Sequence, residues 1–294
     1  MTILVYHSGA LGDFVTVLPL LRLLLRRQPD SELAFLGRRV HGELGRAAGY
    51  FSETWDLDSA RYAGLFADRP HALPPELARP DAAVAFAADD SPVVRALLSR
   101  PLAFFLHHPP FPSGRTHVVD YHLQLLGDTP LGDGNRRPSL RLQPGLRAED
   151  LHRTVALHPG SGSLKKNWPI ERFEGLAERL AARGLEPLWV SGPVEEEAGV
   201  QVPDQGRVAR LPDLCDLAST LAGCALYVGN DSGVSHLAAA AGCPTVALFG
   251  PTDPAVWAPR GPEVSVVRSR SRAMDGISVD EAAEACGVML GGME

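Results

Sequence analysis

The only two lysines of the chain, Lys165 and Lys166, lie in a glycine- and serine-rich segment, His158–Pro169. An apolar run, Val155–Leu157, precedes this segment, and a helical pattern, Ile170–Arg183, follows it. A strand, a loop of small residues and a helix can hold a phosphate group, because backbone N–H groups and the positive end of the helix dipole point at it. A lysine adds charge-assisted hydrogen bonds worth about 1.5–3 kcal/mol each. The pattern predicts a phosphate-binding loop, with a plain solvated loop as the alternative.

A second loop of this kind follows the apolar run Ala225–Val228. Its turn, Gly229-Asn230-Asp231-Ser232-Gly233, leads into a helix of small residues, so the N–H groups of Ser232 and Gly233 are expected to form another anion-binding nest. His236 lies on the first turn of that helix and can face the same anion, although a packed histidine fits the position equally well. Two nests on neighbouring strand-to-helix units suit a diphosphate.

The loop after the first expected strand carries Gly9, Gly12 and Asp13. Its spacing is GxxG, so the dinucleotide-binding fingerprint GxGxxG is incomplete. Asp13 falls at the N-cap or in the first turn of the next helix, where aspartate is a favoured capping residue. The alternative is a general base that takes a proton from an acceptor hydroxyl. The helix dipole lowers the pKa of a carboxylate at this position, whereas desolvation raises it.

An acidic run, Glu195-Glu196-Glu197, follows the expected strand Pro187–Ser191. A carboxylate here can accept hydrogen bonds from the hydroxyl groups of a ribose. Acidic residues are also favoured at a helix start, so the sequence leaves both interpretations open.

Short apolar runs alternate with helical patterns along the chain, which predicts parallel sheets built from β-α-β units. Strands are expected at Ile3–His7, Glu32–Leu36, Ala82–Ala87, Leu102–Leu106, Val155–His158, Pro187–Ser191, Ala225–Val228, Thr245–Phe249 and Val264–Val267. Helices are expected at Phe14–Arg27, His117–Leu126, Ile170–Arg183, Leu214–Gly223, Gly233–Ala241 and Val279–Leu290. His107 and His108 fit the end of a strand better than a set of metal ligands.

Residues 128–153 are rich in turn-forming and charged residues, which predicts a domain boundary there. The expected fold class is α/β, a GT-B arrangement of two Rossmann-like domains, 1–150 and 151–294, whose parallel sheets face a central cleft. Ligands of such sheets bind beyond the carboxyl ends of the strands. The sequence leaves open whether the last helix packs back on the first domain.

The composition limits the functions that the chain can have. A net charge of −7 argues against general nucleic-acid binding, which needs a basic face. The four cysteines form no CxxC pair and the ten histidines no HExxH pattern, so reduced thiols of a cytoplasmic protein and no metal site are expected. No signal peptide is recognisable, and the apolar stretch Phe14–Leu25 is interrupted by Thr16, Pro19 and Arg22, which predicts no transmembrane span.

Taken together, the loops resemble glycosyltransferase family 9, the ADP-heptose:lipopolysaccharide heptosyltransferases. The matching stretches are Gly9–Pro19, His158–Pro169, Gly229–Ala240 and Pro244–Pro254. The resemblance implies a GT-B fold and an inverting, metal-independent transfer of a heptose from ADP-heptose, without a cofactor. The implied acceptor is a lipopolysaccharide inner-core sugar or a related glycan.

By position, the resemblance makes Asp13 the general base, with Gly9 and Gly12 on the acceptor side. It makes Lys166 the phosphate-binding lysine and Glu196 the ribose-binding glutamate. The other donor-binding residues that it implies are Ser161, Asp231, Ser232, Gly233 and His236. The typical acceptor is embedded in a membrane, which implies a cytoplasmic enzyme in peripheral contact with the inner membrane.

The first half is short for the family, and residues 107–116 do not fit its pattern, so another sugar or acceptor stays open. The candidates for contact with headgroups or acceptor phosphates are Arg26, Arg27, Arg38 and Arg39.

Three other functions are open as well. One is an NADP oxidoreductase that grips the 2′-phosphate with Arg38 and Arg39, although the GxGxxG pattern is missing. The others are a GT-B sugar-nucleotide epimerase and a nucleotide-binding relic without catalysis.

Overall fold

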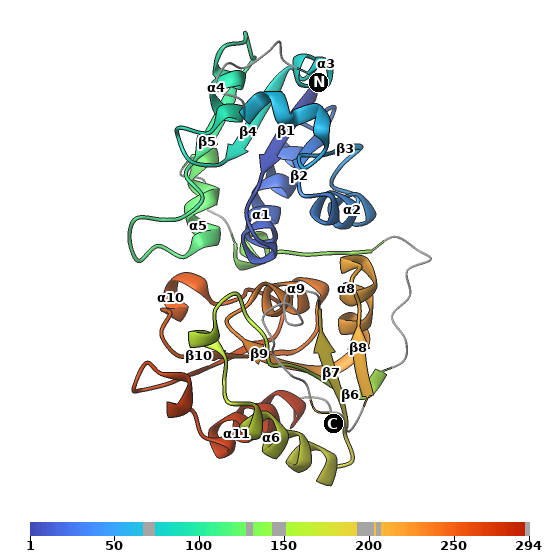
Figure 1. Cartoon of the computed structure of the whole chain (residues 1–294), viewed down its shortest axis with the longest axis vertical. Coiled ribbons are helices and arrows are strands. Elements are labelled where there is room, and N and C mark those ends of the chain that lie inside the picture. The colour runs from blue at the N-terminus through green and yellow to red at the C-terminus, as the bar shows by residue number, and fades with distance from the viewer. Residues whose placement is uncertain (67–73, 128–131, 143–150, 193–202, 204–206, 292–294) are drawn as a thin grey trace. The chain divides into compact units, whose positions relative to one another are not determined.

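The computed structural model of the protein describes residues 1–66, 74–127, 132–142, 151–192, 203 and 207–291. The chain divides into two compact units. Unit 1 is formed by Met1–Asn135 and Arg141–Gln143, and unit 2 by Arg136–Leu140 and Pro144–Glu294. Each unit is an α/β structure built on one parallel sheet, as the sequence predicts (Figure 1).

The sheet of unit 1 has five parallel strands in the order β3-β2-β1-β4-β5. These are β1 (Thr2–His7), β2 (Glu32–Gly37), β3 (Glu53–Asp56), β4 (Ala82–Phe86) and β5 (Phe105–His108). The central strand β1 is buried from Ile3 to His7, as expected for a strand covered on both faces. The strand order reverses between β1 and β4, and open α/β sheets bind ligands beside such a switch point.

The helices of the first part of the chain connect these strands. They are α1 (Leu11–Arg27), α2 (Arg39–Ala47), α3 (Pro75–Ala78), α4 (Pro92–Leu98), α5 (Val118–Leu123) and the 3-10 helices η1 (Ala60–Phe66), η2 (Gln124–Leu126) and η3 (Asp133–Arg136). The longest, α1, buries the expected apolar face that includes Phe14, Leu18 and Leu21. It begins at Leu11, three residues earlier than expected, and therefore includes Asp13 in its first turn.

The sheet of unit 2 has six parallel strands in the order β11-β10-β9-β6-β7-β8. These are β6 (Leu151–His158), β7 (Glu186–Ser191), β8 (Arg207–Arg210), β9 (Cys224–Asn230), β10 (Thr245–Phe249) and β11 (Val264–Arg268). Counted from β6, this is the 3-2-1-4-5-6 order of a Rossmann fold, with the switch point between β6 and β9. His158 pairs in register with Gly229, so the carboxyl ends of these two strands lie side by side.

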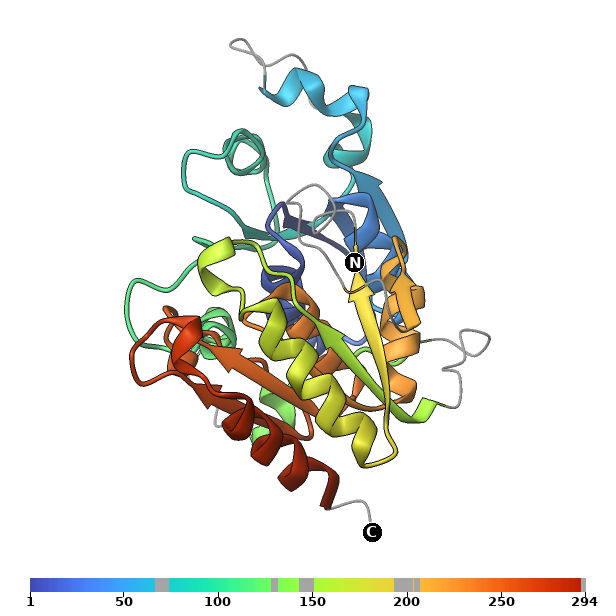
Figure 2. The same cartoon turned by 60° about the horizontal axis from the view of Figure 1, so that its bottom comes forward.

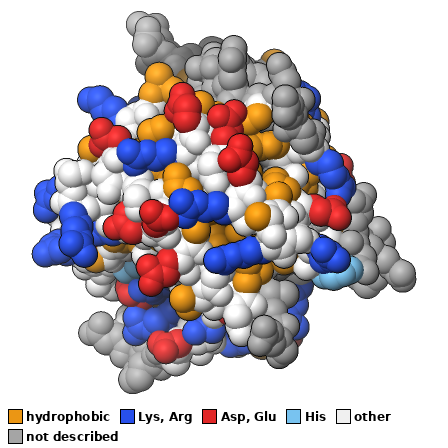
Figure 3. All heavy atoms as spheres, turned by 90° about the horizontal axis from the view of Figure 1, so that it is seen from below, with side chains coloured by type: hydrophobic (Ala, Val, Ile, Leu, Met, Phe, Trp, Pro, Cys, Tyr) orange, Lys and Arg blue, Asp and Glu red, His pale blue; other side chains and the backbone are white. Residues whose placement is uncertain are grey.

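The helices of unit 2 pack on its sheet. They are α6 (Ile170–Ala182), α8 (Leu214–Gly223), α9 (Gly233–Ala241), α10 (Pro254–Trp257), α11 (Val279–Leu290) and the 3-10 helices η4 (Leu164–Lys166) and η5 (Met274–Gly276). Figure 2 shows α6 and α11 side by side, and α11 also contacts β9, β10 and β11. Acidic and basic side chains are interspersed on the face of unit 2 seen in Figure 3, and Arg179 of α6 pairs with Asp280 of α11.

The sequence patterns predicted the inner strands and one edge strand of each sheet, β5 and β11, and missed the other edge strand. The edge strands β3 and β8 were not expected, and neither were α2 and α4. β3 and β8 have four residues each, and no residue of either strand is buried. Neither strand has the apolar run by which a buried strand is predicted. The edge strand β5 begins three residues later than expected, at Phe105, and ends with His107 and His108 as predicted.

Three histidines are buried in unit 1 near the carboxyl ends of its strands. His7 ends β1, His41 stacks on Phe14 with 5.0 Å between ring centroids, and His122 meets Phe86 edge-on at 5.2 Å. Within the part of the chain that the structure describes, no hydrogen bond reaches the Nδ1 atom of any of the three. Burial lowers the pKa of His7 and His122 to about 3 and that of His41 to about 4. All three imidazoles are therefore neutral at pH 7.

These neutral histidines make the stability of unit 1 depend on pH. Below pH 6.5 the histidines of the unfolded chain bind protons, whereas the buried histidines of the folded unit stay neutral. Their contribution to the free energy of unfolding is therefore fully present above pH 6.5 and is lost as the pH drops toward about 4. Each histidine contributes about 1.4 kcal/mol per pH unit in this window. The free energy of unfolding, measured by urea denaturation, should fall between pH 7 and pH 5 in both the wild type and His122→Phe. We expect this fall to be about 2 kcal/mol smaller in the variant, which lacks one of the titrating histidines.

The matched control is Phe86→Leu, which loses packing against the same histidine but no titrating group. Its stability should be lower at both pH values and its pH dependence unchanged. Equal pH dependence in His122→Phe and the wild type would show that His122 is not held neutral.

Candidate functional site

Three loops at the carboxyl edge of the unit 2 sheet carry the polar residues of the candidate site. They follow β6, β9 and β10, of which β6 and β10 both neighbour β9 in the sheet. The first loop holds Lys166, the second Asp231 and the third Thr252. Their side chains meet at the switch point of the sheet, where the fold favours a ligand.

Asp231 joins the three loops through a single carboxylate oxygen. Its Oδ2 accepts a hydrogen bond from Thr252 Oγ1 at 2.8 Å and lies 3.2 Å from Lys166 Nζ. The side chain of Asp231 is 10% exposed and that of Lys166 is 24% exposed, so the ion pair is largely shielded from water. The backbone N–H of Asp231 donates to the carbonyl of Leu248 at 3.0 Å, which fixes the turn against β10.

Asn230 ties the lysine loop to the end of β9. Its buried side chain donates from Nδ2 to the carbonyl of Pro159 at 2.7 Å and accepts at Oδ1 from the backbone N–H of Trp168 at 3.0 Å. These partners stand at the two ends of the loop, so one amide fixes both ends. Trp168 is 1% exposed, and its indole N–H donates to the carbonyl of Ile277 at 2.9 Å, so it anchors the end of the loop.

Ser161 makes its contacts inside the lysine loop. Its hydroxyl lies 2.5 Å from Asn167 Oδ1 and 2.8 Å from the carbonyl oxygen of Ser163. The residue is buried, and in this structure its hydroxyl stabilises the loop. A direct contact of Ser161 with a donor stays a prediction.

The N-terminus of α9 has the form of an anion-binding nest. Ser232 is the N-cap, and its hydroxyl accepts from the N–H of Ser235 at 3.4 Å. Among the described residues, neither the Gly233 nor the Val234 N–H donates a hydrogen bond, as is usual for the first turn of a helix. These two groups can therefore bind an anion that reaches the helix end.

His236 lies on the same turn and is buried. Burial lowers its pKa to about 4, the carboxylate of Asp231 opposes this shift, and the ammonium group of Lys166 adds to it. The backbone of Trp257 also forms a hydrogen bond with the ring and opposes the effect of burial. The imidazole is neutral at pH 7, so it supplies no charge, and its single N–H is engaged by the backbone. A direct contact of His236 with a donor stays a prediction.

Unit 1 places Asp13 at the third residue of α1. Its Oδ2 accepts from the backbone N–H of Ala10 at 3.1 Å, so the side chain contacts the helix start as the capping interpretation expects. Gly9 permits this approach, because a Cβ at this position would lie 3.0 Å from both Asp13 Oδ2 and His7 Cε1. Gly12 precedes Asp13 in the same turn.

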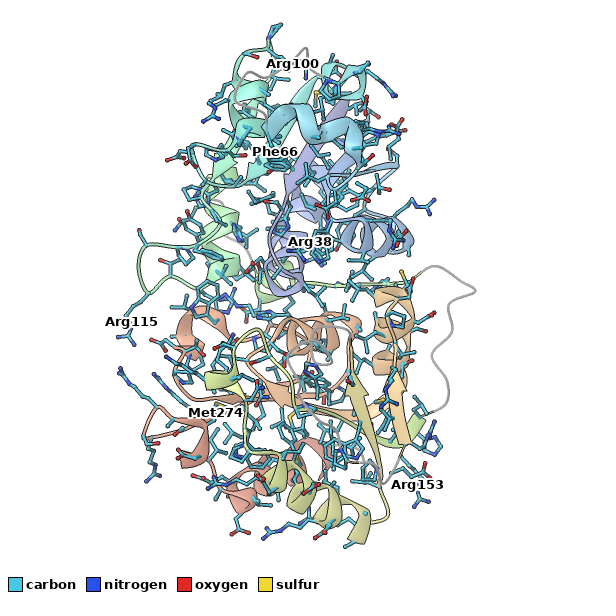
Figure 4. All side chains as sticks on the ribbon, viewed as in Figure 1. Arg38, Phe66, Arg100, Arg115, Arg153 and Met274 are labelled. Carbon is cyan, nitrogen blue, oxygen red and sulfur yellow. The ribbon has the colours of Figure 1, made fainter. Side chains whose placement is uncertain are left out.

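Arg38, labelled in Figure 4, follows β2 and is the N-cap of α2. Its charge contributes to the lowered pKa of His7 and of His41, so it lies near the carboxyl edge of the unit 1 sheet. Arg39 pairs with Glu43 at 2.9 Å on the surface of α2.

One expected site residue lies outside the described part of the chain. Glu196 lies in residues 193–202, which the structure does not describe. No group of three or more His, Cys, Asp or Glu side chains suited to a metal ion occurs in the described ranges. None of the helices described here has the length and apolar character needed to cross a membrane.

Sequence reasoning missed the roles of Asn230 and Thr252. Both belong to stretches that carried the family resemblance, but neither was singled out. A fully buried asparagine at a strand end was the available signal for Asn230, because a buried amide needs partners for both its donor and its acceptor. Nothing in the sequence shows that Thr252 and Asp231 meet, since 21 positions separate them.

The comparisons with known proteins show the family and the fold of the chain. The sequence model of glycosyltransferase family 9 (heptosyltransferase) matches residues 113–284, more than half of the chain. The chain belongs to glycosyltransferase family 9. The match includes the whole of the unit 2 site and begins after Asp13, so the role of Asp13 is not covered by it.

Lipopolysaccharide heptosyltransferase 1 of Pseudomonas aeruginosa is 40% identical over 104 residues, which are 34% of this chain and 29% of that protein. The chain matches only 29% to 50% of the length of this relative and the next two curated relatives.

Two solved structures share the fold over nearly the whole chain. The family 9 glycosyltransferase from Veillonella parvula has a TM-score of 0.79 at 19% identity and covers 99% of this chain and 97% of its own. An Escherichia coli heptosyltransferase solved with ADP has a TM-score of 0.76 at 19% identity, covering 98% and 100%. The fold is therefore GT-B, as the resemblance implied.

The double contact of Asn230 generates a stability prediction. Asn230→Ala leaves the Pro159 carbonyl and the Trp168 N–H buried without their partner, and each such group costs about 1–3 kcal/mol. We expect the free energy of unfolding of unit 2 to fall by about 2–5 kcal/mol, measured by urea denaturation followed through tryptophan fluorescence. Ser163→Ala, an exposed change in the same loop, is the matched control and should stay within about 0.5 kcal/mol of the wild type. Equal stability of the two variants would contradict the assigned role of Asn230.

Proposed function

We propose that the protein is an inverting, metal-independent glycosyltransferase that moves a heptose from ADP-heptose to a lipopolysaccharide inner-core sugar or a related glycan. The observation that carries the proposal is the meeting of Lys166 and Asp231 beside the first turn of α9 in a chain of glycosyltransferase family 9. ADP in the related Escherichia coli heptosyltransferase supports ADP as the nucleotide part of the donor.

The leaving group determines what the unit 2 site has to do. As the bond between the anomeric carbon and the diphosphate oxygen breaks, negative charge grows on the departing ADP. Lys166 supplies the full positive charge, and the N–H groups of Gly233 and Val234 supply hydrogen bonds where that charge develops. Neutral His236 lines the site on the same turn without adding charge. In this proposal Glu196 accepts hydrogen bonds from the ribose, and Ser161, Asp231 and Ser232 line the diphosphate and sugar.

The acceptor hydroxyl forms the new bond to the anomeric carbon from the face opposite to ADP, which inverts the configuration at that carbon. Its proton passes to the carboxylate of Asp13, so ADP leaves with the bonding electron pair and no other reactant is needed. Gly9 supports this role, because it lets the Asp13 carboxylate approach the end of β1 closely. Unit 1, which carries Asp13, is then the acceptor-binding domain, and unit 2 binds the donor.

An acceptor of this kind is lipid-linked or part of a core oligosaccharide. We therefore place the protein in the cytoplasm, with peripheral contact to the inner face of the inner membrane. Family membership favours glycosyl transfer over the oxidoreductase, epimerase and relic alternatives. Arg39 is paired with Glu43, which weakens the case for an NADP clamp of Arg38 and Arg39.

The donor assignment predicts a selective loss of ADP affinity in Lys166→Ala. Without added metal, calorimetry should show that the wild type binds ADP more tightly than UDP or NADPH. The variant should bind ADP about 10- to 150-fold more weakly, because one charge-assisted contact of about 1.5–3 kcal/mol is lost.

Lys165→Ala is the matched control, because Lys165 is exposed and adjacent in the same loop. It should bind ADP within about twofold of the wild type, as expected for an exposed charge outside the site. No preference for ADP over UDP and NADPH, or equal affinities in the two lysine variants, would contradict an ADP-sugar donor.

The general base is tested by turnover. Asp13→Asn keeps an oxygen that can accept from the Ala10 N–H, so the helix start is preserved while the base is lost. We expect kcat to fall by a factor of about 10²–10⁴ with ADP affinity unchanged, measured as ADP release from ADP-heptose with inner-core acceptors in the presence of EDTA. Retained turnover in the variant would remove Asp13 from the mechanism, and wild-type turnover that needs an added metal ion would contradict metal independence.

A further inference from the structure

We propose that Thr252 is a positioning residue that holds Lys166 ready for the diphosphate by acting through Asp231. This inference rests on the proposed function for the identity of the ligand. It assigns to the loop after β10 a part in donor binding without direct contact between Thr252 and the donor.

Thr252 and Lys166 share one carboxylate oxygen of Asp231. Asp231 Oδ2 accepts from Thr252 Oγ1 at 2.8 Å and faces Lys166 Nζ at 3.2 Å. Because the backbone N–H of Asp231 is bound to Leu248, the main chain of the turn is fixed and only the carboxylate can rotate. The hydroxyl of Thr252 therefore selects the carboxylate orientation in which Oδ2 meets the ammonium group.

Thr252 is itself held by a rigid loop. Gly250 packs against Met274, labelled in Figure 4, so closely that a Cβ at this position would lie 2.6 Å from the Met274 sulfur. On the other side, Asp253 caps α10 by accepting from the N–H of Ala255 at 3.2 Å. The position of the Thr252 hydroxyl is therefore fixed by contacts on both sides of it in the loop.

Holding the pair in this way has two consequences for a diphosphate. A free lysine side chain occupies many rotamers, and ordering it before the ligand arrives removes part of the entropic cost of binding. The carboxylate of Asp231 would repel a diphosphate if it stood alone beside the nest of α9. Pairing with Lys166, whose charge is opposite, offsets this repulsion, and Thr252 acts by holding the carboxylate where the two charges meet.

The test is a double-mutant cycle on ADP affinity with Thr252→Val and Lys166→Ala. Thr252→Val keeps the shape of the side chain and removes the hydroxyl, and Thr252→Ser is the control that keeps the hydroxyl. In the wild-type background, Val should raise the Kd for ADP about three- to tenfold, the size of one hydrogen bond, and Ser should stay within about twofold. In the Lys166→Ala background, Thr252→Val should have no further effect, because the lysine that Thr252 positions through Asp231 is gone.

An equal loss of affinity in both backgrounds would mean that Thr252 contacts the donor or supports the fold alone, and the inference would be overturned. No loss in the wild-type background would overturn it as well. If the wild type does not bind ADP, the proposed function fails. The link between Thr252 and Lys166 is then tested without ligand, by urea denaturation of the wild type, the two single variants and the double variant. Additive shifts of the urea midpoint would then contradict a link between Thr252 and Lys166, and non-additive shifts would support it.

Discussion

The buried turn at the end of β9 is the constraint on which the candidate site depends. Asn230 has no contact with water, so both ends of its amide must find partners in the protein, and the partners are the two ends of the lysine loop. The next residue, Asp231, is fixed by its backbone to β10 and by its carboxylate to Lys166 and Thr252. Two consecutive side chains thus set the relative positions of three loops that are separate in the sequence.

The parallel sheet explains why those loops can meet at all. In a Rossmann order the strands on either side of the switch point, β6 and β9, send their chains away in opposite directions, which leaves room above their carboxyl ends. The first turn of α9 points its N–H groups into that room, and the lysine loop closes one side of it. Unit 1 repeats the plan with β1 and β4, and there the loop after β1 carries Asp13.

The sequence predicted this arrangement where local patterns decide the structure. Buried parallel strands are continuous apolar runs, and Ser232 and Gly233 mark the start of α9, so the inner strands and the start of this helix were predicted correctly. The edge strands β3 and β8 were missed because half-exposed strands of four residues have no such run. The contact between Thr252 and Asp231 was missed for a different reason, since a tertiary hydrogen bond between two loops leaves no periodic signal in either of them.

The charges of the two units complete the physical picture. Burial holds His236 neutral beside Asp231, and it holds His7 neutral beside Gly9 and Asp13. Lys166 is therefore the positively charged group held beside the first turn of α9, where a leaving diphosphate would meet it together with fixed hydrogen-bond donors. Because fixed dipoles need no reorganisation as charge develops, a single well-oriented lysine can do what a cluster of mobile cations would do less well. The orientation of that lysine is then the property that the surrounding structure has to secure, and Asn230, Asp231 and Thr252 are the residues placed to secure it.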